Sequence, residues 1–357
     1  MTAPRYRWQP TTLEIAERFG IRLADVVRFD HNTSPFTSEW AAPIAMPIAA
    51  HLNEYPGASY RPLRDAAASY LGTAAETVVP GAGVDEIILL IAKAFLGVGK
   101  RATALVPTYP LYEIATLQMG AEFLTVPFEP PTFGVPSRAL GEAAETSDVT
   151  WLCVPNNPTG HRISDDEIGA VVRSAKGIVV IDAAYAEFSG DRWAPWISRY
   201  DNLIVCTTMS KAFGLAGLRV GFAMASPDVA LALDGVRPPG SIASVSAAIA
   251  ESALRTPQRM ERHVEQILRE RTRFAEALSS CGAAPVRDMA TNFVLCEIGP
   301  SAAVIADDLM AEGLVVRRFP EDGGLASFLR FTVRSEQENA RLIDALGRHM
   351  AARRHRQ

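Results

Sequence analysis

The chain has few of the residues that mark metal-binding or secreted proteins. Its 357 residues include only four cysteines and six histidines, with no CxxC pair and no metal-ligand spacing of the histidines. Three of the cysteines, Cys153, Cys206 and Cys296, lie far apart, each in an apolar, strand-like run. We therefore expect buried free thiols in a reducing compartment rather than disulfides, and no metal site.

Long apolar runs and an excess of positive charge are also absent. The longest apolar stretch, residues 87–98, contains Lys93 and is too short to span a bilayer, and residues 1–7 lack the apolar core of a signal peptide. The formal net charge is -5, and the one strongly basic stretch, residues 348–356, fits the solvated end of a helix. We expect a cytoplasmic protein that binds neither membranes nor nucleic acid.

What the chain does contain is an alternation of strand and helix patterns. With 48% apolar and 21% charged residues, it has the composition of a globular protein and the length of two or three lobes. Helical patterns at 85–95, 109–118 and 165–174 lie between short apolar runs that predict strands at 102–106, 123–127, 149–154, 177–181, 203–207 and 220–224. Strands that are apolar throughout are covered by helices on both faces, so we predict an α/β domain with a mostly parallel sheet.

After about residue 250 the pattern changes. A long charged helix is predicted at 257–279, then strands at 292–297, 314–317 and 328–333, and a final helix from Glu336. This order predicts a smaller α+β lobe. We expect three parts: an N-terminal arm (1–30) that packs on the small lobe, a large domain (31–250) and a small C-terminal domain (251–357).

The run of residues 207–219, Thr-Thr-Met-Ser-Lys-Ala-Phe-Gly-Leu-Ala-Gly-Leu-Arg, is the strongest functional signal. Its small residues allow close approach, and Thr208, Ser210 and Arg219 can hold an anion near the amine of Lys211. An amine beside an anion site suits a cofactor that forms a Schiff base and carries a phosphate. Pyridoxal 5′-phosphate has both properties.

Two further segments can contribute to such a site: one opens a predicted helix, and the other follows a predicted strand. Gly81-Ala82-Gly83-Val84-Asp85 can present backbone N–H groups to a phosphate, although Asp85 could equally be an ordinary helix-start carboxylate. The third glycine of a dinucleotide fingerprint is missing. Tyr109, after the strand at 102–106, could lie flat against a heteroaromatic ring or be a half-buried loop residue.

Two more segments carry polar groups to strand ends. In Val-Pro-Asn-Asn-Pro-Thr-Gly (154–160), Asn157 can donate to a phenolate oxygen, or the run can be only a rigid turn. Asp182 ends an apolar strand and needs a cationic partner, either a protonated pyridine nitrogen or an arginine. Tyr185 can hydrogen-bond a cofactor ring oxygen.

Taken together, these segments resemble the fold-type I pyridoxal-phosphate enzymes of the class I/II aminotransferases, and among them the histidinol-phosphate aminotransferase branch. The resemblance extends from about residue 29 to 345 and is carried most specifically by Ser-Lys-Ala-Phe-Gly-Leu-Ala-Gly-Leu-Arg and Pro-Asn-Asn-Pro-Thr-Gly. It implies that Lys211 binds the cofactor covalently and moves the substrate proton, and that Asp182 pairs with the ring nitrogen. The remaining cofactor contacts that it implies are Tyr109, Asn157, Tyr185, Thr208, Ser210, Arg219 and the backbone of Gly83, Val84 and Asp85.

The resemblance also implies substrate contacts and an assembly. Arg330 matches an arginine that binds the substrate anion, and Arg317 one that helps to bind the phosphate of histidinol phosphate; surface ion pairs are the alternative for both. Asn32 and Trp8 fall at substrate-facing positions. Tyr55 matches a tyrosine that reaches the cofactor phosphate of the neighbouring subunit, which implies a homodimer with shared active sites.

Some substrate-facing positions depart from the family pattern. Asn-Thr-Ser-Pro (32–35) replaces Asn-Glu-Asn-Pro, Trp8 replaces a tyrosine, and Pro-Gly-Ser (239–241) and Arg-Ser (334–335) replace Pro-Tyr-Asn and Gly-Thr. The cofactor residues are therefore intact while the substrate pocket is altered.

The resulting prediction is an aminotransferase that acts between an amino acid or amino-alcohol phosphate and a 2-oxo acid. Histidinol phosphate and aromatic amino acids are candidate donors. A decarboxylase or other lyase like threonine-phosphate decarboxylase is the alternative, since it would use the same lysine. A cofactor-sensing regulator with this fold would be expected to carry a helix-turn-helix domain ahead of it. Fewer than thirty residues precede the match here, so we do not expect this class.

Overall fold

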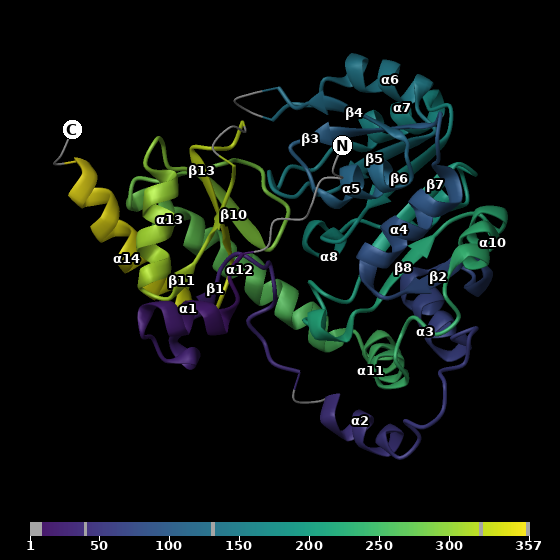
Figure 1. The fold of residues 1–357 in the computed structure, drawn as a ribbon, viewed down its shortest axis with the longest axis horizontal. Helices are drawn as coiled ribbons and strands as arrows, with labels where there is room; N and C mark the ends of the chain where they lie inside the picture. The colour runs from purple at the N-terminus through teal and green to yellow at the C-terminus, as the bar shows by residue number, and fades with distance from the viewer. Residues whose placement is uncertain (1–8, 39–40, 130–132, 321–323, 355–357) are drawn as a thin grey trace.

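The computed structural model describes residues 9–38, 41–129, 133–320 and 324–354 (Figure 1). Its centre is a seven-stranded sheet in the order β2-β8-β7-β6-β5-β3-β4. The strands are β2 (Val78–Gly81), β3 (Arg101–Val106), β4 (Glu122–Pro127), β5 (Val149–Cys153), β6 (Ile178–Asp182), β7 (Leu203–Thr208) and β8 (Gly221–Met224). Only β8 runs antiparallel to its neighbours, so the prediction of a mostly parallel sheet is confirmed.

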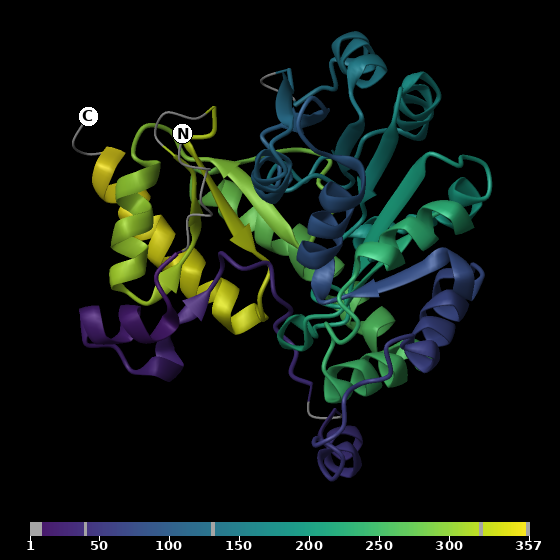
Figure 2. The same cartoon turned by 45° about the vertical axis from the view of Figure 1, so that its right-hand side comes forward.

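Alternate residues of these strands pack into two different cores. Val180 of β6 belongs to a core with helices α4 (Gly83–Phe95), α5 (Leu111–Gln118) and α10 (Pro227–Val236). Its neighbours Val179 and Ile181 belong to the core on the opposite face, with α3 (Arg61–Leu71), α6 (Ser137–Thr146) and α7 (Asp165–Ser174). Helices on both sides of the sheet are visible in Figure 2. Burial on two faces explains why the strands are apolar throughout.

The C-terminal part forms a second, antiparallel sheet in the order β12-β13-β10-β9. Its strands are β9 (Ala284–Pro285), β10 (Phe293–Glu297), β12 (Arg317–Arg318) and β13 (Phe328–Thr332). The helices of this part are α12 (Gln258–Ser280), α13 (Ala302–Ala311) and α14 (Glu336–Arg354). The basic end of α14 pairs with acidic residues of α13 and the residue after it: Arg348 with Glu312, and Arg353 with Asp308.

The N-terminal segment lies against this C-terminal part (Figure 1). It contains α1 (Thr12–Phe19) and β1 (Val27–Arg28), and β1 pairs in parallel with β11 (Leu314–Val315). The prediction of one strand at 314–317 is therefore wrong. β11 pairs with β1, whereas β12 pairs with β13, and the buried Val316 separates the two. A local apolar pattern cannot show which neighbour each half of such a run pairs with.

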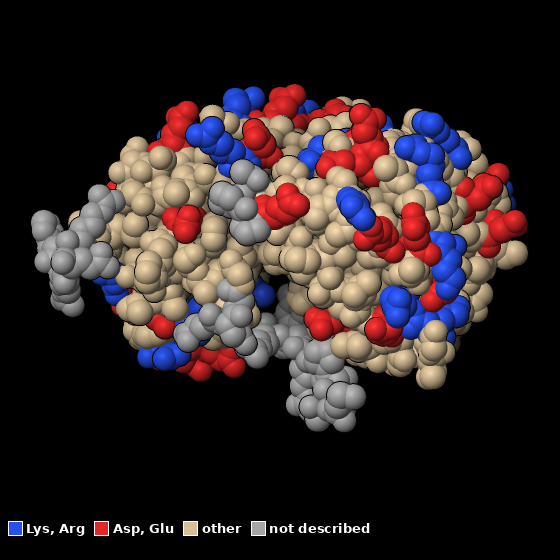
Figure 3. Space-filling model, turned by 90° about the horizontal axis from the view of Figure 1, so that it is seen from above, with Lys and Arg blue, Asp and Glu red and all other residues tan. Residues whose placement is uncertain are grey.

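The remaining elements connect these parts. They are the helices α2 (Ala42–Ala49), α8 (Ala186–Ser189), α9 (Ala194–Ile197) and α11 (Ser244–Arg255), with short 3-10 turns at Leu23–Asp25, Ala75–Thr77 and Ala216–Leu218. Among the described residues, no helix combines the length and the apolar character needed to cross a bilayer. On the face drawn in Figure 3, positive and negative side chains are interspersed rather than gathered by sign.

The cysteines follow the prediction. Cys153, Cys206 and Cys296 are buried in β5, β7 and β10, and all three are free thiols. Burial raises the pKa of each of these thiols, so they remain protonated and unreactive.

Candidate active site

The predicted residues gather at the edge of the large sheet where its parallel strands end. Asp182 is the last residue of β6 and pairs in register with Cys153, the last residue of β5. Thr208 is the last residue of β7, and Lys211 follows it in the next loop. Parallel strands end at one edge, so residues far apart in the chain come together there.

Asp182 is a buried carboxylate without an arginine partner. Its side chain accepts hydrogen bonds from the Tyr112 hydroxyl at 2.6 Å and from the Ala184 N–H at 3.1 Å. Burial raises its pKa to about 6, against the lowering effect of those two donors. No ion pair joins Asp182 to an arginine in the part of the chain that the structure describes. A carboxylate held ionised by neutral donors suits a protonated pyridine nitrogen.

Lys211 is half-buried in the loop after β7. Its Nζ donates to the backbone carbonyl of His31 at 3.2 Å and lies 6.0 Å from the centroid of the Tyr185 ring. Burial lowers the pKa of the amine to about 8, and the nearby cation of Arg330 adds to this. A larger share of Lys211 is therefore neutral at physiological pH, as a nucleophilic or basic amine requires.

The residues predicted to hold a phosphate lie close to one another. The Thr208 hydroxyl donates to Ser210 Oγ at 3.0 Å and accepts from the Ser210 N–H at 3.1 Å. Arg219 forms an ion pair with Asp85 at 2.8 Å, and the Tyr109 hydroxyl donates to the same carboxylate at 2.9 Å. Hydroxyls, a guanidinium and the start of α4 are the donors that a phosphate accepts from.

Two glycines allow the backbone and Arg219 to approach this region. A Cβ at Gly83, whose φ is +81°, would lie 2.6 Å from Nη2 of Arg219. A Cβ at Gly221 would lie 2.7 Å from the backbone nitrogen of Val84. A side chain at Gly83 would displace the Arg219 guanidinium and be strained at this φ, whereas a side chain at Gly221 would push the start of α4 away from the end of the sheet.

On the opposite side, β13 carries Arg330, which is 6% exposed. Its Nη1 donates to Oδ1 of Asn157, and its Nη2 donates to the backbone carbonyl of Asp30 at 2.7 Å. Its guanidinium carbon lies 5.0 Å from the centroid of the Phe293 ring. Arg330 is thus buried in the site rather than on the surface. Arg317 is its partner in the pairing of β12 with β13 and is half-buried.

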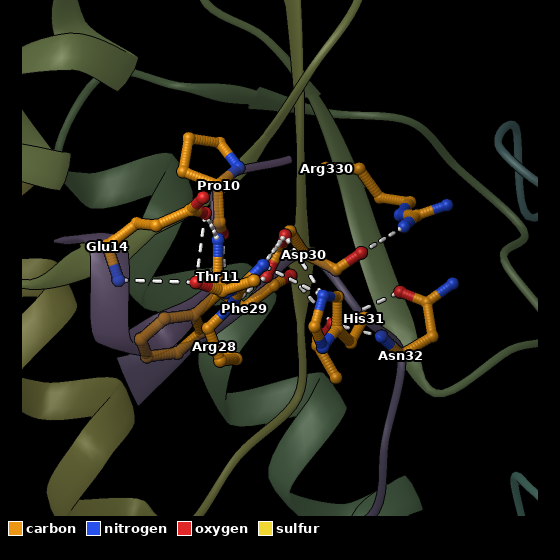
Figure 4. Close-up of polar contacts among 10 residues, drawn as sticks. Pro10, Thr11, Glu14, Arg28, Phe29, Asp30, His31, Asn32 and Arg330 are labelled. Carbon is orange, nitrogen blue, oxygen red and sulfur yellow. Dashed lines mark hydrogen bonds and ion pairs between the residues drawn. The ribbon is translucent and has the colours of Figure 1, made fainter. Parts of the chain in front are cut away.

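The N-terminal segment completes the site (Figure 4). Asn32, whose φ is +52°, donates from Nδ2 to the Tyr185 hydroxyl at 2.9 Å. Three consecutive residues of this segment therefore each contact one residue of the site: Asp30 contacts Arg330, His31 contacts Lys211, and Asn32 contacts Tyr185. Burial raises the pKa of Tyr185, so its hydroxyl stays protonated and can donate.

A buried ion pair fixes the same segment. Arg28 donates to both carboxylate oxygens of Asp30 at 2.8 and 2.7 Å, and the Asp30 side chain is fully buried. Arg28 also contacts Nε2 of His31 at 2.8 Å (Figure 4). This bidentate pair fixes the backbone whose carbonyls meet Arg330 and Lys211.

Sequence reasoning missed three residues of this arrangement: Asp30, His31 and Tyr112. The sequence shows Asp30 and His31 directly before Asn32, and Tyr112 three residues after Tyr109. Nothing in the local pattern marks these three residues as part of the site. Their contacts join positions 300, 180 and 70 residues apart, which no local pattern encodes.

One predicted residue, Tyr55, is not brought to the site within this chain. Tyr55 lies in the loop between α2 and α3 and is 96% exposed. Trp8 lies outside the described residues. Two positions that depart from the family pattern do meet: Arg334 donates from Nη1 to the backbone carbonyl of Ser34 at 3.3 Å.

A mostly parallel sheet with a lysine, a buried carboxylate and a cluster of hydroxyl and guanidinium donors at the ends of its strands is typical of fold-type I pyridoxal-phosphate enzymes. The sequence profile of the family "Aminotransferase class I and II" matches residues 25–346. The chain therefore belongs to the class I and II aminotransferase family, and it is a pyridoxal-phosphate-dependent transaminase.

Two relatives with similar sequences carry the same activity in their names. The chain is 36% identical over 297 residues to the histidinol-phosphate aminotransferase of Caldanaerobacter subterraneus subsp. tengcongensis, covering 83% of this chain and 84% of that one. It is 35% identical over 326 residues to histidinol-phosphate aminotransferase 2 of Idiomarina loihiensis, covering 88% and 89%.

Solved structures share the fold. The histidinol-phosphate aminotransferase of Sinorhizobium meliloti, in complex with pyridoxal-5′-phosphate, superposes with a TM-score of 0.86 over 97% of this chain and 96% of that one, at 24% identity. The L-threonine-O-3-phosphate decarboxylase of Porphyromonas gingivalis superposes with a TM-score of 0.80 over 91% and 100%, at 22% identity. At these identities the likeness concerns the fold alone.

Proposed function

We propose that this transaminase uses the amino-alcohol phosphate histidinol phosphate, or alternatively an aromatic or other amino acid, as amino donor and a 2-oxo acid as acceptor. The observation that carries the proposal is the meeting of Lys211 and Arg330 at consecutive carbonyls of one segment, those of His31 and Asp30. A basic amine and an anion-binding guanidinium are thereby held at one place, as a substrate with an amine and an anion requires.

The residues around this place fit pyridoxal phosphate. Asp182 would hold the ring nitrogen, Asn157 and Tyr185 the ring hydroxyl, and Tyr109 one face of the ring. The phosphate would be held by the Thr208 and Ser210 hydroxyls, Arg219 and the backbone N–H groups of Gly83, Val84 and Asp85. When bound, the cofactor supplies a carbonyl that reacts with amines and a ring that accepts the electron pair of the broken Cα–H bond.

Lys211 is then the group that moves the substrate proton. Its pKa of about 8 lets the neutral amine accept a proton from the substrate Cα near neutral pH and return it at the end of the transfer. The buried carboxylate of Asp182 keeps the proton on the ring nitrogen.

Arg330 would bind the anion of the substrate, with Arg317 on the neighbouring strand as a second cation. A guanidinium fork binds a carboxylate or a phosphate by two parallel hydrogen bonds. The names of the relatives at 35–36% identity favour the phosphate of histidinol phosphate.

The assembly proposed is a cytoplasmic homodimer with shared active sites. Helix α2, Ala-Pro-Ile-Ala-Met-Pro-Ile-Ala, contains no buried residue, packs on α11 and stands at the edge of the molecule (Figure 1). Met46, Leu52 and Tyr55 in and after it are 73%, 61% and 96% exposed. Exposed large apolar side chains within ten residues of one another support an interface, and a second copy would bring Tyr55 to a neighbouring site.

A screen of amino donors tests the substrate proposal. Histidinol phosphate, phenylalanine, tyrosine and arginine are each mixed with the cofactor-loaded enzyme, and the loss of the cofactor's visible absorbance is followed in a single turnover. Reaction with histidinol phosphate far faster than with the others supports the proposal. Reaction with the amino acids alone assigns a different donor. Release of CO2 without formation of a keto product would assign a decarboxylase instead.

A further inference from the structure

Tyr112 is a buried polar residue that the roles above do not use. It lies on α5 and is fully buried, and its hydroxyl donates to Oδ2 of Asp182 at 2.6 Å. The other carboxylate oxygen, Oδ1, accepts from the Ala184 N–H. Each oxygen of the carboxylate thus has one donor, and the Tyr112 donor is the only side chain that hydrogen-bonds to Asp182 among the described residues.

Aromatic packing fixes the place of this hydroxyl. The Tyr112 ring stacks on Trp151 of β5, with ring centroids 5.2 Å apart and planes 5° from parallel. The edge of a second ring, Tyr109, meets it at 5.8 Å and 83°. A ring held on both sides keeps its hydroxyl in one position and leaves little motion to the hydrogen bond.

Two tyrosines at the start of α5 and just before it, Tyr112 and Tyr109, therefore each hold a carboxylate by a hydrogen bond. Tyr109 donates to Asp85 beside the proposed phosphate contacts, and Tyr112, three residues later, donates to Asp182 at the end of β6. The two rings lie next to each other, with their centroids 5.8 Å apart.

We propose that Tyr112 is a positioning residue that holds the Asp182 carboxylate ionised and aimed at the ring nitrogen of pyridoxal phosphate. This role rests on the function proposed above. Burial by itself favours the protonated, neutral acid, which cannot hold a protonated ring nitrogen by charge. A hydrogen bond from a neutral donor offsets this effect. Burial and the neighbouring Asp182 raise the pKa of Tyr112, so the tyrosine keeps its proton and remains a donor.

The test is Tyr112→Phe, which removes the hydroxyl and retains the ring packing. Tyr60→Phe is the matched control: Tyr60 is 5% exposed, its hydroxyl donates to the Ile242 carbonyl at 2.8 Å, and it lies apart from the site. The apparent Kd of pyridoxal phosphate is measured by spectral titration of the cofactor-free proteins. The absorbance of the bound cofactor is followed between pH 5.5 and 9, and kcat and KM are measured for one donor.

For Tyr112→Phe we expect the cofactor Kd to rise about tenfold or more. The absorbance–pH profile should shift and kcat should fall about tenfold, with KM for the donor changed less than twofold. Tyr60→Phe should match the wild type in all four measurements, and the unfolding midpoint of cofactor-free Tyr112→Phe should stay near that of Tyr60→Phe.

Two outcomes would overturn the inference. If Tyr112→Phe binds the cofactor as tightly as the wild type and its absorbance–pH profile superposes, Tyr112 is only a packing residue, while the proposed function stands. If the wild type itself binds no cofactor, the proposed function fails and this role fails with it.

Discussion

At the scale of single residues, the chemistry of the site depends on burial. Lys211 and Asp182 are a base and an acid whose pKa values move toward neutrality, to about 8 and about 6, chiefly because both lose contact with water. At physiological pH an amine with such a pKa is partly neutral, while a carboxyl with such a pKa is still mostly ionised. Residue types alone would have given ordinary values, so the local environment decides the reactivity.

Replacing Lys211 by alanine tests the central role. The variant has no amine to bind the cofactor covalently or to move the proton, so turnover should fall by at least about 1,000-fold. The visible absorbance of the lysine-bound cofactor should disappear. Lys93→Ala is the control, because Lys93 is exposed on α4 and its amine donates to the Val236 carbonyl. Turnover near the wild-type rate in Lys211→Ala would refute the assignment.

The pKa of Lys211 gives a pH dependence. The amine reacts only when it is unprotonated, and burial lowers its pKa from 10.5 to about 8. The rate at which the cofactor-free protein recombines with pyridoxal phosphate should therefore rise with pH from about 6.5 and level off above about 8.5. Stopped-flow absorbance measures this rate. A rate that continued to rise steeply to pH 10 would show that the environment does not lower the pKa.

At the scale of elements, the segment from β1 to Asn32 organises the site from outside the large sheet. It is fixed by pairing with β11 and by the hydroxyl of Thr332, which donates to the Phe29 carbonyl at 2.6 Å. It then presents two carbonyls and one amide to groups from both sheets. A short N-terminal segment thus joins the two halves of the active site.

The Arg28–Asp30 ion pair is the point at which this segment can be tested. Asp30→Asn removes the bidentate charge pair, so the Asp30 carbonyl should lose its fixed place beside Arg330. We expect KM for the amino donor to rise about tenfold while the absorbance of the bound cofactor is retained. Steady-state kinetics and a spectrum measure both.

The control is Asp234→Asn, which breaks the ion pairs of Asp234 with Arg64 and Arg237, residues with no proposed role in the site; the Asp234 side chain is 25% exposed, against 0% for Asp30. Both variants should lose a few kcal/mol of unfolding free energy. If KM rises equally in both, the effect reflects general destabilisation and the positioning role is wrong.

At the scale of the whole molecule, one chain does not bring together every predicted contact. Tyr55 is almost completely exposed, and Met46 of α2 and Leu52 after it are also largely exposed, although α2 packs on α11. In the proposed homodimer, each site takes its lysine from one subunit and Tyr55 from the other.

Mixing two inactive variants tests this arrangement. In a hybrid dimer of Lys211→Ala and Tyr55→Ala chains, one site carries both substitutions and the other carries neither. Random reassociation makes about half of the dimers hybrids, so about a quarter of wild-type activity should return. Each variant alone, taken through the same denaturation and refolding, is the control. No recovery, with light scattering still showing a dimer, would place Tyr55 outside the neighbouring site.

Much of the fold could be predicted from local patterns, and the errors have local causes. The predicted helix at 165–174 has the bounds of α7, which a capping box at Ser164 and Glu167 begins. β2 was missed because it has only four residues, one of them proline. The run at 314–317 was read as one strand because its apolar pattern is continuous, although its halves join different sheets.

The sequence by itself determined the chemistry of this protein, because Lys211, Asp182 and their neighbours stand in short motifs next to strands that the apolar pattern defines. The mostly parallel sheet, with these motifs at the carboxyl ends of its strands, follows from the same pattern, whereas the order of the strands in the sheet does not. Only the tertiary structure decided how these groups are held. Tyr112 meets Asp182 across 70 residues, and Asp30 meets Arg330 across 300. Contacts of that range depend on how separate elements pack against each other, which no local pattern contains.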